Sequence, residues 1–182
     1  MNEAQVAAVA GKRTLTRTRD IEMSEEKKVV DLFIADVKRT AGVYATNPAL
    51  AALGLCTELG EFFADGGSMD EAGDVLWHAA VLAPHLGLAI DKTVVPFAET
   101  EQVQLDALLL RLDHVKKFLV GHADRRREAS AAVMAAVARA LHPYRSREEQ
   151  EIVMLLNMAK REKRFPGAAP EVVALLKERG YL

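Results

Sequence analysis

The chain has 182 residues, a formal net charge of −2 and one cysteine, Cys56. A charge so close to zero argues against a dedicated nucleic-acid-binding domain, which is usually strongly basic. A single cysteine excludes an internal disulfide framework and suits a reducing compartment. No stretch approaches the roughly 20 apolar residues of a membrane span, and the apolar run at 6–10 is too short for a signal peptide. We therefore expect a cytoplasmic protein that binds neither nucleic acid nor membrane.

The hydrophobic pattern predicts an all-α fold, because alanine and leucine dominate the apolar half of the chain and the apolar residues recur at helical spacing. Residues 1–23 are polar and lack a sustained period, so we expect a mobile N-terminal tail before a helical domain at 24–182. Ser68 and Ser146 are predicted N-caps, and Glu149 completes a capping box with Ser146. The predicted helices start at Ser24, run to a break near Gly42, and then cover about 49–64, 69–86, a stretch after Pro96 that includes 105–119, 125–141, 147–164 and 170–179.

The block at 91–147 is either an insertion or a degenerate internal repeat. Sliding the sequence by 57 residues places Glu71 on Glu128 and His85 on His142. The other acids are not repeated, since Glu58 falls on Val115 in this alignment. Alanine-rich helices align easily by chance, so both interpretations stay open.

Two predicted helices each carry a pair of acids three residues apart, and a short Gly66–Gly67 turn separates the helices. Glu58 and Glu61 lie on the first helix, and Glu71 and Asp74 lie on the second. At about 100° per residue, positions i and i+3 share one face of a helix. If the helices pack antiparallel, the carboxylates form two tiers, with Glu61 opposite Glu71 and Glu58 opposite Asp74.

Four carboxylates so close together would repel one another, and a divalent cation would remove that cost. Hard oxygen ligands suit Mg²⁺ or Mn²⁺. The acids lie among apolar residues, and Gly60 and Gly73 interrupt their helices as if to allow close helix approach or room for a ligand. We expect substitution of any of the four acids by its amide to leave the stability of the metal-free protein unchanged or higher. The competing interpretation is that the acids are solvated groups on amphipathic helices.

Several segments together resemble the MazG-like branch of the all-α nucleoside triphosphate pyrophosphohydrolases, among which are phage enzymes that act on dGTP. The resemblance covers about residues 32–90 and 150–167. It is carried by Thr40-Ala41, Leu50-Ala51-Ala52-Leu53-Gly54-Leu55, Glu58-Leu59-Gly60-Glu61, Glu71-Ala72-Gly73-Asp74-Val75-Leu76-Trp77 and Asn157-x-x-Lys160-x-x-x-Arg164-Phe165-Pro166. Thr57 stands where many members carry a further acid, and the block at 91–147 has no counterpart in the minimal family fold.

The resemblance implies a Mg²⁺-dependent hydrolase that converts a nucleoside triphosphate to a monophosphate and pyrophosphate. It implies that Glu58, Glu61, Glu71 and Asp74 hold the metal, for which Mn²⁺ can substitute. It also implies that pockets are completed in a homo-oligomer, a dimer or tetramer, and it assigns contacts with metal or triphosphate to Asn157, Lys160 and Arg164. Glu61 is our choice for the residue that positions the attacking water.

The base preference is predicted from small side chains near the acidic hairpin, among them Ala49 and Gly54, which leave room for a purine deoxynucleotide. Tyr44 or Trp77 could stack on the base, although core packing is the more ordinary role for a tryptophan. His78 and His85 are expected to be surface or core histidines. Alternative functions are a related dUTP, dCTP or phosphoribosyl-ATP hydrolase, or a helical nucleotide sensor or interaction protein without catalytic activity.

Overall fold

The computed structural model of the chain describes residues 28–94, 105–167 and 169–182, and every element of regular structure in these ranges is a helix. This confirms the all-α prediction for the described part of the chain. The predicted tail, the Ser24 helix start and Pro96 lie outside the described residues. Within the described ranges, no helix is both long enough and apolar enough to cross a membrane.

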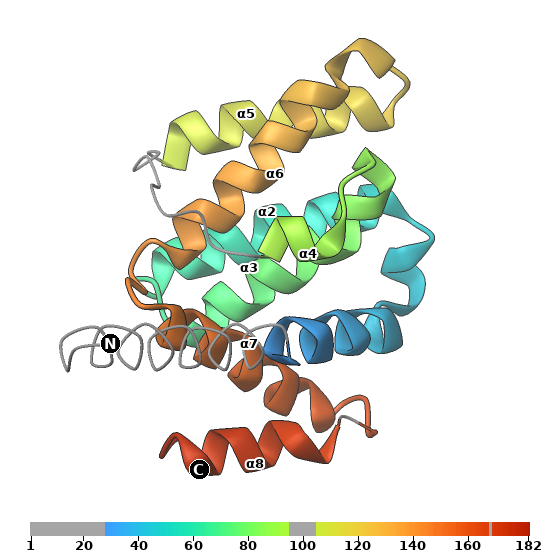
Figure 1. Cartoon of the computed structure of the whole chain (residues 1–182). Coiled ribbons are helices and arrows are strands. Elements are labelled where there is room, and N and C mark those ends of the chain that lie inside the picture. The colour runs from blue at the N-terminus through green and yellow to red at the C-terminus, as the bar shows by residue number, and fades with distance from the viewer. Residues whose placement is uncertain (1–27, 95–104, 168) are drawn as a thin grey trace, which may run out of the picture.

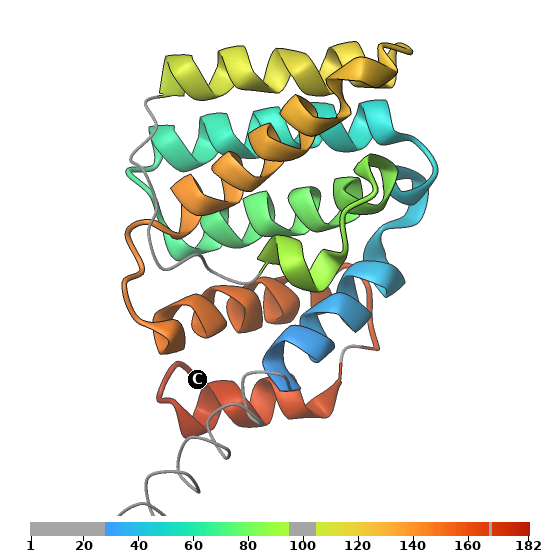
Figure 2. The same cartoon turned by 45° about the horizontal axis from the view of Figure 1, so that its top comes forward.

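The helices lie in successive layers (Figures 1 and 2). Helix α5 forms one outer layer, the α2–α3 hairpin forms the middle, and α7 with the helix at 28–40 separates that hairpin from α8. Helix α6 crosses the side of the stack and packs on both α5 and α3. The bounds are Pro48–Ala64 for α2, Met69–Leu82 for α3, Ile90–Val94 for α4, Leu105–Leu119 for α5, Arg126–Leu141 for α6, Arg147–Glu162 for α7 and Pro170–Glu178 for α8, with 3₁₀ turns at Gly42–Ala45, Ala83–Leu86 and Ala123–Arg125.

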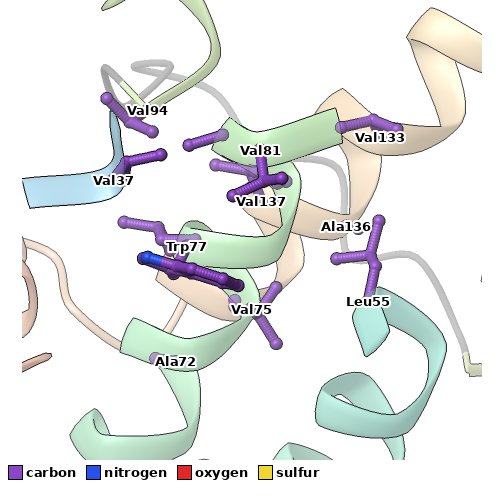
Figure 3. Packing of buried hydrophobic residues seen from close by; sticks show 14 of the residues in the cluster. Val37, Leu55, Ala72, Val75, Trp77, Val81, Val94, Val133, Ala136 and Val137 are labelled. Carbon is purple, nitrogen blue, oxygen red and sulfur yellow. The ribbon is translucent and has the colours of Figure 1, made fainter. Parts of the chain in front are cut away.

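Helix α3 is the central helix of the molecule because it is apolar on nearly every side. All of its residues from Ala72 to Leu82 are buried. It packs against α2, α6 and α7, as expected for a helix that has no polar face. Figure 3 shows Trp77 of this helix among valine and alanine side chains that come from several other helices.

The local signals that end and begin helices are confirmed. The Asn47 and Ser68 side chains accept hydrogen bonds from the first turns of α2 and α3. Ser146 and Glu149 form the predicted capping box at the start of α7. The third predicted helix, however, ends as an α-helix at Leu82 rather than 86, because Pro84 has no N–H for a continuing helix and the chain tightens into a 3₁₀ turn. Helix α4 was not predicted.

The α5–α6 hairpin repeats the layout of the α2–α3 hairpin. When α2 and α3 are shifted by 57 residues, Pro48 falls on Leu105 and Met69 falls on Arg126, so the starts of both helices coincide. The two hairpins pack on each other, α5 against α2 and α6 against α3. Whether this layout arose by insertion or duplication stays open.

Candidate metal centre

Three of the predicted metal ligands meet at the interface between α2 and α3. Glu58, Glu61 and Glu71 each offer one carboxylate oxygen, and these three atoms lie within 4.8 Å of one another. Glu58 and Glu61 share a face of α2, and the short turn brings Glu71 of α3 opposite them. We call these three residues the glutamate cluster.

Glu71 carries the feature of the cluster that most needs a partner. Its Oε2 atom is buried and has no hydrogen-bond partner among the described residues. Burial raises the pKa of the Glu71 carboxyl, and the nearby charges of Asp74, Glu58 and Asp70 add to this rise while Lys160 opposes it. A buried carboxylate oxygen without a donor is costly. A hard divalent cation would satisfy it, so the residues present fit the predicted Mg²⁺.

Asp74, the fourth predicted ligand, lies against α7 rather than within the glutamate cluster. Its carboxylate accepts hydrogen bonds from Asn157 Nδ2 at 2.7 Å, Lys160 Nζ at 2.7 Å and Arg161 Nη2 at 3.1 Å. The residue is only 8% exposed. Three residues along a helix turn the side chain by about 300°, which leaves it about 60° from its predecessor. Because α3 lies between α2 and α7, that offset is enough to direct Glu71 to one neighbour and Asp74 to the other.

The donors of α7 reach Asp74 because α3 and α7 approach closely at a glycine. A Cβ atom at Gly73 would lie 2.7 Å from the Cβ of Asn157, so this glycine allows the close approach that the sequence suggested. Asn157 is fully buried. Lys160 Nζ donates a second 2.7 Å hydrogen bond to Asp70, at the rim of the same site. Gly60 differs, since nothing in the described structure lies within 4 Å of a Cβ built there.

Arg161 is a member of this network that the sequence analysis did not single out. Its guanidinium lies over the Trp77 ring, 3.8 Å from the ring centroid, and its Nε donates to Asn157 Oδ1 at 3.1 Å. Burial lowers its pKa, although Asp74 and Asp36 favour the charged form. Its spacing of four residues from Asn157 was the available signal, because i and i+4 share a face of a helix. Arg164, the predicted phosphate ligand, follows the end of α7 and is exposed.

The two aromatic residues predicted to stack on a base contact each other. Trp77 is 2% exposed, and its Nε1 donates to Thr40 Oγ1 at 2.9 Å. Tyr44 is half-buried and lies edge-on to both Trp77 and His78. A base could stack on Trp77 only if the covering side chains moved, so the stacking role stays a prediction, with Tyr44 the more accessible ring.

His78 links these aromatic rings to the glutamate cluster. The side chain is buried, as one of the two expected settings for this histidine, and its Nε2 lies 3.5 Å from Glu58 Oε1. A Cβ at Gly54 would lie 2.2 Å from the imidazole, so the histidine fills the space that the sequence analysis assigned to a base. Only a glycine at position 54 leaves His78 room to reach Glu58.

Comparisons of the chain with family models, with curated proteins and with solved structures gave no match. The MazG-like resemblance therefore rests on the motifs described above.

Proposed function

We propose that the chain is a Mg²⁺-dependent nucleoside triphosphate pyrophosphohydrolase of the MazG-like kind. The observation that carries the proposal is the glutamate cluster, in which three carboxylates meet at a helix interface and Glu71 Oε2 is buried without a donor. Acids placed in this way are costly unless a cation binds them. The basic residues of α7 on the adjacent side of α3 are suited to a phosphate chain.

The roles of the residues follow from their positions. The glutamate cluster would hold the metal, which when bound neutralises phosphate charge and activates water. Glu61, the exposed member of the cluster, would position the attacking water and take its proton. The water oxygen forms the new bond to the α-phosphorus, and the bond from that phosphorus to the bridging oxygen breaks, so that pyrophosphate leaves. Lys160 is one-third exposed and can turn from Asp70 toward a phosphate.

The test is a panel of the eight common NTPs and dNTPs, assayed for pyrophosphate with Mg²⁺ and with Mn²⁺. We expect a monophosphate and pyrophosphate, with a purine deoxynucleotide preferred. Orthophosphate with a diphosphate would refute the proposed cleavage site, and a pyrimidine preference would favour the dUTP- or dCTP-hydrolysing alternative. Stabilisation by Mn²⁺ and nucleotide without turnover of any of the eight would instead identify a sensor.

The metal ligands are tested by Glu58→Gln, Glu61→Gln and Glu71→Gln, with Asp65→Asn as the matched control. Asp65 is an exposed acid in the turn of the same hairpin. Each cluster variant should lose turnover and Mn²⁺ affinity, whereas the control should retain both. A cluster variant with normal turnover would not be a ligand.

We also propose a homo-oligomer, the assembly implied by the family resemblance. The α5–α6 hairpin packs on α2 and α3 within the chain, so that a small assembly such as a dimer would suffice. Light scattering that shows a monodisperse and fully active monomer would reject the oligomer.

A further inference from the structure

A large groove runs between α7 and α8. Its volume is about 890 Å³, within the range of about 300–1,000 Å³ that small-molecule sites occupy. Leu156 and Ala159 form the α7 wall, and Val172 and Val173 form the α8 wall. Val173 is 42% exposed, and so it presents an apolar surface to whatever enters the groove.

One end of the groove adjoins the glutamate cluster. Lys160 and Asp70 both line the groove, and Lys160 Nζ lies 2.7 Å from the carboxylates of Asp70 and Asp74. Asp70 immediately precedes Glu71 at the start of α3. Lys160 also lies close enough to Glu71 to lower the pKa of that carboxyl against the effect of burial. A ligand that occupies the groove can therefore extend past Lys160 to the cluster.

Two other hollows lie elsewhere. A hollow of about 260 Å³ between α2 and α5 is lined by Ala52 and Cys56, which lie on the side of α2 opposite Glu58 and Glu61 at about 100° per residue. A third, of about 210 Å³, lies beside Val37 and Pro84. Neither is lined by a residue of the glutamate cluster or by its neighbours on α7.

The lining of the α7–α8 groove suits an amphipathic anion. The apolar walls match the flat faces of a base, while Lys160 and Lys163 supply positive charge. Glu162 and Asp70 add acceptors for amino or hydroxyl groups. A nucleoside with a phosphate chain combines these three properties in one molecule.

We propose that the α7–α8 groove binds the nucleoside part of the substrate, and that the phosphate chain passes Lys160 to reach the glutamate cluster. This inference rests on the proposed function for the identity of the ligand. It places the base on the Glu71 side of the cluster, whereas the Tyr44 and Trp77 prediction places it beside His78 on the Glu58 side. The space for a base over Gly54 is filled by His78, while the groove is open.

The test compares Val173→Trp with Ala174→Trp. Val173 lines the groove, and the adjacent Ala174 is exposed but does not line it. Calorimetry with Mg²⁺ would measure binding of a non-hydrolysable α,β-methylene dGTP analogue and of inorganic tripolyphosphate. We expect Val173→Trp to weaken the nucleotide analogue at least tenfold and to leave tripolyphosphate and Mn²⁺ binding unchanged. Ala174→Trp should leave all three unchanged. Ala159→Phe, on the opposite wall, should repeat the Val173→Trp result.

Three outcomes would overturn the groove as the nucleoside site. The first is unchanged nucleotide affinity in both groove variants when circular dichroism shows that they are folded. The second is an equal loss of tripolyphosphate affinity, which would show a general disturbance. The third is a tenfold loss in Tyr44→Ala but not in Val173→Trp, which would place the base beside His78. The proposed function fails separately, if the wild-type protein turns over none of the eight nucleotides.

Discussion

Asp74 should stabilise the metal-free fold, whereas the glutamate cluster should strain it. Asp74→Asn keeps the shape of the side chain but removes the charge that faces Lys160 and Arg161. Its amide nitrogen would also meet a donor in place of an acceptor. Breaking one side of a buried ion pair costs about 3–5 kcal/mol. Because the Lys160 side chain is 34% exposed and partly screened by water, we expect a smaller loss of about 2–4 kcal/mol.

Thermal and urea unfolding in the presence of EDTA would measure this loss. For a chain of this length, 1 kcal/mol corresponds to about 2–4 °C in Tm. A loss of about 3 kcal/mol therefore lowers Tm by roughly 6–12 °C. Glu61→Gln is the matched control, since Glu61 is exposed and removal of its charge relieves repulsion within the cluster, so that its Tm should be unchanged or higher. An Asp74→Asn variant that melts with the control would refute this reasoning and return Asp74 to the set of acids that only repel.

Three further predictions test the site and its supports. Gly54→Ala should destabilise the protein by about 1–3 kcal/mol in urea unfolding, because its Cβ would overlap the enclosed His78 ring, whereas Gly60→Ala, with open space at its Cβ, should stabilise by up to about 1 kcal/mol; equal effects would contradict the packing. Glu71→Gln should raise the Tm of the metal-free protein but abolish the Tm increase that Mn²⁺ gives the wild type, and a persisting increase would remove Glu71 from the ligands. The Ser146 backbone N–H lowers the pKa of Glu149, so Glu149 stabilises α7 above its ordinary value of 4.5 and loses this effect as pH falls through the lowered pKa; the difference in Tm between wild type and Glu149→Gln should therefore be present at pH 7 and vanish in strong acid.

Local patterns predicted the helices well because helix ends depend on a few adjacent residues. The cap at Ser146 needs only Glu149, three positions away, and both lie in the sequence pattern. The short helix α4 was missed because five residues give too little periodicity to recognise. Pro84 did mark an end to α3, but the predicted helix ran through it because the apolar pattern continues to Leu86.

The glutamate cluster was predictable in part because a short turn fixes the relative height of the two helices it joins. The turn at Gly66–Gly67 sets Glu61 opposite Glu71, as the residue count suggested. The side to which Asp74 turns depends on where α7 packs, and α7 lies more than 70 residues further along the chain. No count within the hairpin could supply that position.

The same reasoning bears on the block at 91–147. Helix starts that coincide after a shift of 57 residues require both helix lengths and the intervening turn to be matched, which favours duplication over an unrelated insertion. In the second hairpin Val115 stands at the position of Glu58 and is buried in the core. A metal ligand in the first hairpin is thus a packing residue in the second. The second hairpin covers the faces of α2 and α3 that lie away from α7, and it leaves the glutamate cluster and the α7–α8 groove to perform the chemistry.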